Sequence, residues 1–237
     1  MGLLEFSVNF FVALFALLDP IGNVPIFAAA TGSANNAQRR WVAFYISLFA
    51  AAFLAFFYFT GLAILQFFGV SMEAFRIAGG ILLFLLGLDM ARGDFIGMFE
   101  AAETRVTETA EGVAPSSRDY ARKRFENLIV PFGIPLLIGP GAISTVIIQA
   151  AEAQKLGHAG TAAGFGVIVL VSAALMGTFF LTSHISKLLG RIGMVIVIRV
   201  LGLILCAMAV QFIISGIGDT TANLIAPNVA HPYSGSK

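Results

Sequence analysis

Charged residues are scarce in this chain. Asp, Glu, Lys and Arg together make up 11% of its 237 residues, whereas they make up about a quarter of a typical soluble domain. The formal net charge of +1 argues against nucleic acid as a partner, because such partners are bound mainly by basic side chains. Cysteine is nearly absent too: the single Cys206 lies in an apolar run and excludes an intrachain disulfide.

Two further kinds of chemistry lack the residues they need. The histidines His158, His184 and His231 are scattered along the sequence, so no metal site is expected. No stretch matches GxxxxGK[ST], the phosphate-binding loop of nucleotide-driven pumps, which excludes an ATP motor within this chain. We therefore expect neither an enzyme nor a resident cofactor.

Hydrophobic residues are what the chain has in abundance. They make up 58% of the sequence, and the mean hydropathy is +0.91. Apolar runs of about 20 residues recur, the length that an α-helix needs to cross a bilayer. Barrel strands would instead give segments of about ten residues with alternating polarity. The sequence therefore predicts an all-α integral membrane protein.

The apolar runs predict six transmembrane segments. They cover residues 6–30, 41–68, 74–91, 128–151, 161–182 and 193–217. We interpret 1–237 as a single membrane domain, with 5–91 and 128–217 as its two halves. Residues 92–127 carry mixed charges and are interpreted as a solvated connector, and 218–237 as a flexible C-terminal tail.

Basic residues are divided unevenly between the two predicted sides of the membrane. The connections after the first, third and fifth segments hold Arg39, Arg40, Arg92, Arg105, Arg118, Arg122, Lys123, Arg124, Lys187 and Arg191. The opposite side holds only Lys155, Lys237 and, at its edge, Arg76. Because basic loops remain in the cytoplasm, both termini are expected on the non-cytoplasmic side and the long charged loop inside the cell.

Short stretches recur between the two halves. The stretch 76–82 (RIAGGIL) is similar to 199–205 (RVLGLIL), and 17–23 (LLDPIGN) is similar to 136–142 (LLIGPGA). The members of these pairs are 123 and 119 residues apart, so the register is nearly constant. Since each half holds three segments, the second half is expected to be inverted in the membrane, as in many secondary transporters.

Proline and glycine interrupt the first and the fourth predicted segments. The first break holds Asp19, Pro20, Gly22, Asn23 and Pro25; the second holds Gly139, Pro140 and Gly141, followed by Ser144 and Thr145. Backbone groups freed at such breaks are tolerated in a membrane only where they are buried in protein or line a polar cavity. Paired breaks in inverted halves predict a substrate site, although kinks that serve only packing remain the alternative.

Asp19 is the residue least compatible with a lipid environment. A carboxylate at mid-membrane costs roughly 3 kcal/mol on insertion scales, which favours a functional role. The side chain either binds a substrate amine, carries a proton, or caps the helix expected to restart at Pro20. The second break differs, because its restarting helix, expected near Ala142, offers free N–H groups to a carboxylate.

Three further charged residues lie near the ends of predicted segments. Arg76 and Arg199 occupy equivalent positions in the two halves and are expected either to snorkel to headgroups or to pair with carboxylates or carbonyls. Asp89 lies close to Arg92 and is interpreted as its partner at the membrane interface.

The two broken stretches resemble a known family. DPIGNVPIF at 19–27 and PLLIGPGAIST at 135–145 resemble the two signature stretches of the MarC family, and RIAGG at 76–80 is similar to its third span. The resemblance implies a six-span inner-membrane protein of bacteria or archaea, grouped with neutral amino acid transporters. It suggests glycine and alanine as substrates of some relatives.

Three readings of function follow. The first is a secondary transporter of a small zwitterion, coupled to a proton or a sodium ion or to neither. The second, an intramembrane aspartyl protease using Asp19 and Asp89, is disfavoured because the two carboxylates are expected at different depths. The third is a channel or a drug-efflux protein; the small size and a tight Gly/Pro site argue against bulky drugs. The sequence leaves the direction of transport open, as it does the formation of a homo-oligomer.

Overall fold

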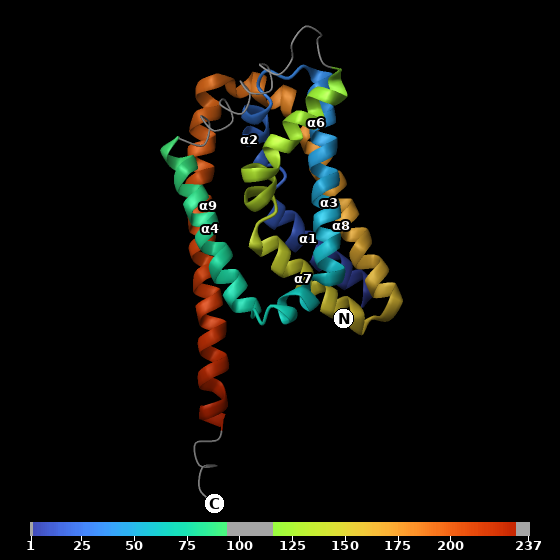
Figure 1. The fold of residues 1–237 in the computed structure, drawn as a ribbon, viewed down its shortest axis with the longest axis vertical. Coiled ribbons are helices and arrows are strands. Elements are labelled where there is room, and N and C mark those ends of the chain that lie inside the picture. The colour runs from blue at the N-terminus through green and yellow to red at the C-terminus, as the bar shows by residue number, and fades with distance from the viewer. Residues whose placement is uncertain (1, 94–115, 231–237) are drawn as a thin grey trace, which may run out of the picture.

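The computed structural model describes residues 2–93 and 116–230, and over these ranges the chain is helical without strands (Figure 1). The elements in chain order are α1 (Leu3–Leu18), α2 (Asn23–Ala30), α3 (Asn36–Phe67), α4 (Met72–Arg92), α6 (Ser117–Leu128), the π-helix η1 (Ile129–Leu137), α7 (Pro140–Lys155), α8 (Gly157–Phe180) and α9 (Thr182–Ala230). The predicted all-α class is confirmed for these residues.

Four helices are long and apolar enough to cross a membrane. They are α3, α4, α8 and residues 195–221 of α9, and α1 with α2 adds a fifth candidate as one span bent by 46°. The predicted fourth segment, 128–151, is not one helix, because it is divided between the end of α6, the irregular η1 and α7. Over the described residues, six uninterrupted crossings are therefore not found.

Polar caps place helix ends outside the apolar runs. The Asn35 side chain accepts a hydrogen bond from the backbone N–H of Gln38 at 2.9 Å, and the Gln38 side chain accepts one from the N–H of Asn35 at 2.9 Å. This reciprocal pair satisfies two amides that a helix start leaves open. Helix α3 therefore begins at Asn36, five residues before the apolar run that predicted it.

The C-terminal segment is helical well beyond its predicted end. Residues 218–237 were expected to form a flexible tail, but α9 continues through most of this range. Asp219 pairs with Arg76 of α4 at 2.8 Å, and the Thr220 hydroxyl donates to a carbonyl one turn earlier. Because these polar groups find partners on helices, their polarity does not end α9. Residues 231–237 lie outside the described ranges.

Helices α4 and α9 lie side by side as an antiparallel pair (Figure 1). Their contact depends on glycine: a Cβ on Gly87 would lie 2.8 Å from the carbonyl oxygen of Gly202, and one on Gly80 would lie 2.8 Å from that of Ala209. Small residues at such positions let helix backbones approach closely in a membrane. The remaining helices form a bundle beside this pair.

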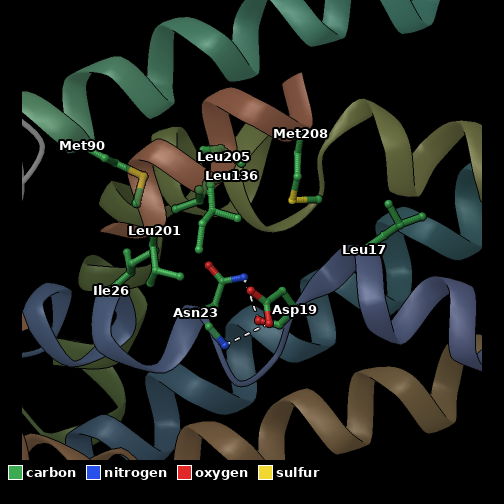
Figure 2. A pocket seen from close by; sticks show the side chains of 11 residues that line it. Leu17, Asp19, Asn23, Ile26, Met90, Leu136, Leu201, Leu205 and Met208 are labelled. Atoms are coloured by element: carbon green, nitrogen blue, oxygen red, sulfur yellow. Dashed lines mark hydrogen bonds between the residues drawn. The ribbon is translucent and has the colours of Figure 1, made fainter. Parts of the chain in front are cut away.

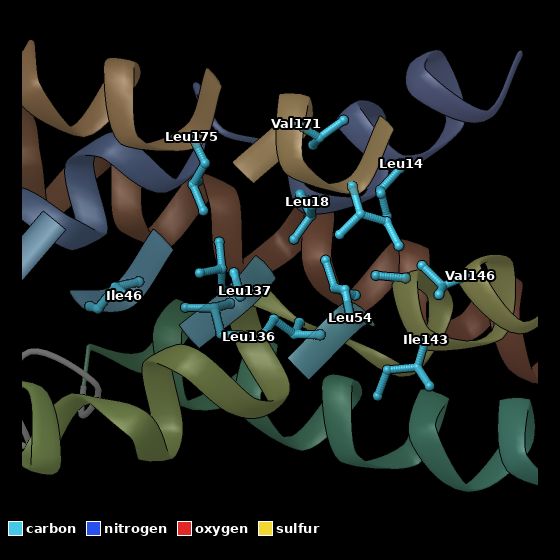
Figure 3. Packing of buried hydrophobic residues seen from close by; sticks show 14 of the residues in the cluster. Leu14, Leu18, Ile46, Leu54, Leu136, Leu137, Ile143, Val146, Val171 and Leu175 are labelled. Carbon is cyan, nitrogen blue, oxygen red and sulfur yellow. The ribbon is translucent and has the colours of Figure 1, made fainter. Parts of the chain in front are cut away.

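The core of that bundle is built on one face of α1. Phe6, Phe10, Leu14 and Leu18 recur at every fourth residue and are fully buried. The spacing places them on one stripe of the helix, which packs against α7 and α8. Figure 3 shows Leu14 and Leu18 in this packing, with Val171 of α8 nearby. The stripe holds α1 against its neighbours up to Leu18, its last residue.

Helix α6 contributes a buried arginine to the bundle. The Nε and Nη2 atoms of Arg124 donate to the carbonyl of Ala30 at 2.9 and 2.6 Å, and Arg39 Nη2 donates to the carbonyl of Thr31 at 3.0 Å. The C-terminal end of α2 thus receives two guanidinium groups, which suit its partial negative charge. Arg124 is fully buried, so the picture of a solvated connector over 92–127 is wrong for this residue.

The ends of the helices fall into two groups (Figure 1). The connection 31–35 and the junction between α8 and α9 lie at one end of the bundle, together with α6. The N-terminus and the turns at 68–71 and 156 lie toward the other end.

Candidate functional site

The first helix ends at Leu18 in a left-handed turn. Asp19 has φ 39° and ψ 64°, the one positive φ outside glycine among the described residues. Aspartate tolerates this conformation better than most residues because its short polar side chain bonds locally. The N–H of Asp19 still closes the last turn of α1 by donating to the carbonyl of Phe15 at 3.1 Å. The chain therefore changes direction directly after α1.

The Asp19 carboxylate holds this turn together. Its Oδ1 accepts a hydrogen bond from the backbone N–H of Gly22 at 3.0 Å. A Cβ on Gly22 would collide with the carboxylate, so a larger residue at this position would displace the Asp19 side chain. The side chain is nevertheless exposed, and its second oxygen is not engaged by the Gly22 amide. Asp19 thus has both a local structural role and an accessible face.

The second half-helix, α2, begins at Asn23 rather than at Pro20 as predicted. Pro20 lies in the turn, and the N-cap residue is Gly22. Pro25 then falls in the first turn of α2, where a missing N–H breaks no helical hydrogen bond. Asn23 itself is 6% exposed, and its Nδ2 donates to the carbonyls of Leu18 at 2.8 Å and Asp19 at 3.1 Å. Asn23 therefore closes the break from the other side.

The second break is longer and less regular. Within η1, Val130 and Ile134 have extended backbone angles, and the Ile134–Pro135 peptide bond is cis. Gly139 is the N-cap of α7 with an extended backbone, and Pro140 occupies the first helical position, which suits it. The helix thus restarts two residues before Ala142, the predicted start.

Two close contacts hold the start of α7. A Cβ on Gly141 would collide with the ring of Phe212 from α9, and one on Gly79 of α4 would collide with the ring of Pro140. The amide N–H groups in the first turn of a helix have no acceptor within that helix. The first intrahelical bond here runs from the N–H of Ile143 to the carbonyl of Gly139, at 3.1 Å. The amides of Gly141 and Ala142 therefore have no acceptor within α7.

Each of the two breaks lines one of two adjoining cavities. The larger, of about 50 Å³, is lined by Leu17, Asp19, Gly22, Asn23, Ile26, Met90, Leu136, Leu201, Ile204, Leu205 and Met208 (Figure 2). The smaller, of about 20 Å³, is lined by Leu17, Leu83, Leu136, Gly139, Gly141, Ala142, Leu205, Met208 and Phe212. Four residues are common to both walls, so the two spaces are neighbours although the breaks lie more than 100 residues apart in sequence.

Half of the ten predicted substrate-binding residues line these cavities. Asp19, Gly22 and Asn23 line the larger, and Gly139 and Gly141 line the smaller. The remaining five line neither cavity; they are Pro20, Pro25, Pro140, Ser144 and Thr145. The prolines shape the backbone instead, and the Ser144 hydroxyl donates to the carbonyl of Gly141 in its own helix at 3.1 Å.

The predicted charge-pairing residues lie away from both cavities. Arg76 pairs with Asp219 on α9, and Arg199 lies against the end of α4, where a Cβ on Gly93 would be 2.8 Å from its Nη2. Among the described residues no ion pair joins Asp89 to Arg92, so that expected pair is not found. Asp89 lines neither cavity and makes no second carboxylate beside Asp19.

Sequence reasoning missed the apolar wall that α9 supplies. Leu201, Leu205, Met208 and Phe212 recur at intervals of three and four residues, so they share one face of the helix. This spacing was available as a signal. The spacing did not identify a site, because the apolar face of a membrane helix has the same sequence pattern whether it faces lipid, the protein core or a cavity.

Comparisons with known proteins identify the family of this chain. The family model described as MarC family integral membrane protein matches residues 4–221. The chain belongs to the MarC family. It is accordingly a multi-pass integral membrane protein, as its long apolar helices indicate.

Other members of the MarC family are similar over most of their length. A UPF0056 membrane protein of Methanocaldococcus jannaschii is 35% identical over 218 residues, which cover 90% of this chain and 97% of the relative. The UPF0056 membrane protein YhcE of Escherichia coli is 32% identical over 214 residues, covering 88% and 90%. One from Aquifex aeolicus is 30% identical over 216 residues, covering 90% and 94%. No solved structure matches the chain.

Proposed function

We propose that this MarC-family protein is a secondary transporter of small neutral amino acids, such as glycine and alanine, across the inner membrane. The observation that supports the proposal most is the meeting of two broken helices at adjoining cavities. Broken helices that meet in the interior are a recurrent way to expose backbone dipoles to a substrate within a membrane. The small volumes favour a small solute over a bulky drug.

The two breaks offer complementary chemistry for a zwitterion. The carboxylate of Asp19 and the side chain of Asn23 line the larger cavity, where an ammonium group would meet oxygen acceptors. The start of α7 borders the smaller cavity, where a carboxylate would meet amide N–H groups and the positive end of the helix. The remaining walls are apolar and would accommodate a short aliphatic side chain.

We further propose six crossings arranged as two inverted repeats. In this arrangement α1 and α2 form the first broken crossing, and η1 and α7 form the fourth. The order of elements supports it: in each half a helix, a break and a second helix precede two long apolar helices. Equivalent helices also pack together across the halves, α3 against α8 and α4 against α9. Alternating access would then move one set of helices past the other around the breaks.

The test of the transport proposal is uptake into proteoliposomes. Proteoliposomes that contain the purified protein should take up labelled glycine or alanine. Both Asp19→Asn and Gly141→Leu should reduce this uptake strongly. In Gly141→Leu the new side chain would collide with the Phe212 ring. Intact uptake in both variants would refute the site. Thermal stabilisation by lipophilic drugs, but not by amino acids, would favour efflux instead.

The test of the topology is a reporter fused after Lys237. We propose that the end of the bundle that holds α6 faces the cytoplasm, because exposed basic residues such as Arg118, Arg122 and Lys123 gather on α6. A periplasmic signal from the reporter is the expected result. A cytoplasmic signal would contradict the proposed orientation.

A further inference from the structure

The side-chain amide of Asn23 is held in one orientation. Its Nδ2 lies 2.8 Å from the carbonyl oxygen of Leu18 and 3.1 Å from that of Asp19. If the amide were turned over, its own oxygen would face two carbonyl oxygens, which repel it. Two backbone acceptors therefore determine which way the amide points.

The other end of the same amide finds no donor among the residues that the structure describes. Among the residues described, none donates a hydrogen bond to Oδ1 of Asn23, although the residue is 6% exposed. Figure 2 shows this oxygen directed into the larger cavity, toward Leu201 and Leu205, away from the two carbonyls. Because the oxygen borders the cavity, a donor that enters the cavity can reach it. The amide thus presents a fixed acceptor to whatever occupies the cavity.

We propose that Oδ1 of Asn23 is the specificity-determining acceptor for the ammonium group of the substrate, and that it restricts the substrate to primary amines. This inference rests on the proposed transport of small zwitterions and names the atom that selects among them. Asp19 lines the same cavity and supplies negative charge. Charge alone attracts any cation, whereas Asn23 adds a requirement for an N–H donor directed at its oxygen.

The distinction follows from the geometry of the donors. A primary ammonium group has three N–H donors, so it can bond to Asn23 and still turn another N–H to the Asp19 carboxylate. Each N-methyl group removes one donor and adds apolar volume to a cavity of about 50 Å³. A quaternary ammonium keeps its charge but has no donor at all. It would leave Oδ1 of Asn23 unsatisfied, which is how buried polar groups reject analogues that lack a hydrogen bond.

The experiment compares glycine with its N-methyl, N,N-dimethyl and N,N,N-trimethyl derivatives as competitors of labelled glycine uptake by the unaltered protein in proteoliposomes. We expect each methyl group to weaken competition, with the trimethyl compound at least about tenfold weaker than glycine, because a hydrogen bond to a charged group is lost. Equal competition by all four compounds would overturn the inference.

Variants give a second measurement. Asn23→Leu removes the acceptor at similar size, and Asn9→Leu is the matched control on exposed α1 surface in the same span. We expect Asn23→Leu to weaken glycine competition about tenfold or more and to remove the preference for glycine over its trimethyl derivative, while Asn9→Leu keeps both. If Asn23→Leu does not fold, the methylated series decides alone. Retained preference in a folded Asn23→Leu protein would overturn the inference.

The same uptake assay distinguishes failure of the transport proposal from failure of the inference about Asn23. If the unaltered protein takes up no zwitterion at all, the transport proposal fails and this inference fails with it. If glycine is taken up but the methylated compounds compete equally, transport stands and only the role of Asn23 is refuted.

Discussion

Replacing Gly87 by alanine should separate α4 from α9. A Cβ at this position would lie 2.8 Å from the Gly202 carbonyl oxygen, 2.8 Å from the Cys206 sulfur and 2.9 Å from the Cys206 backbone nitrogen. Ordinary contact begins near 3.4 Å, and two of these three atoms belong to backbone that cannot turn aside. Forcing an extra methyl group into such packing costs about 1–3 kcal/mol.

Gly177→Ala provides the matched control. Gly177 lies within α8, and a Cβ there would meet nothing within 4 Å. Both changes replace a helical glycine by alanine, which favours the helix by up to about 1 kcal/mol. The difference in unfolding free energy between the two variants therefore isolates the steric cost. We expect Gly87→Ala to be less stable than Gly177→Ala by about 1–3 kcal/mol. Gly202→Ala should behave like Gly87→Ala, since its Cβ would lie 2.7 Å from the Gly87 carbonyl oxygen.

The assay is unfolding in mixed micelles, followed by the fluorescence of the single tryptophan, Trp41. The expected order of stability places Gly177→Ala at or above the unaltered protein and Gly87→Ala clearly below it. If Gly87→Ala proved as stable as Gly177→Ala, the close approach of α4 and α9 would be refuted, and with it the role of glycine in their contact.

Three further predictions concern the site and its supports. Gly22→Ala should abolish amino acid uptake while far-UV circular dichroism stays unchanged, because its methyl group would displace the Asp19 carboxylate from the turn; normal uptake would contradict this. Arg124→Ala should lower unfolding stability by about 2–4 kcal/mol, since it removes two hydrogen bonds from a fully buried group, whereas the exposed Arg122→Ala should change it by less than about 0.5 kcal/mol. Met208→Trp should block uptake without unfolding the protein, because Met208 lines both cavities; unimpaired uptake in a folded variant would exclude these cavities as the route.

Sequence reasoning succeeded where the chemistry is local. Proline and glycine within a few residues, joined at the first break by an intramembrane carboxylate, predict a helix break whatever surrounds them. The chain does break after Leu18, and it breaks again just before Pro140. The position at which each helix restarts depends on the turn that precedes it. That is why α2 begins three residues after Pro20 and α7 two residues before Ala142.

The parts that could not be predicted depend on contacts between distant segments. Arg124 lies in a stretch rich in charge, and only the carbonyl of Ala30, far away in sequence, explains its burial. The wall that α9 contributes to the cavities likewise requires knowledge of which face of that helix turns toward the breaks. Apolar residues in a membrane protein carry little such information, because lipid and protein interior favour the same side chains.

The two arginines at the end of α2 have a mechanical consequence. This half-helix starts at the turn beside the larger cavity and ends under Arg39 and Arg124, whose bonds to its last carbonyls would break if it slid along its axis. Helix α2 is therefore held in place at the end that is remote from the cavity. We therefore expect any opening of the site to involve movement of the face that α9 presents to Asn23, relative to an α2 that is held in place.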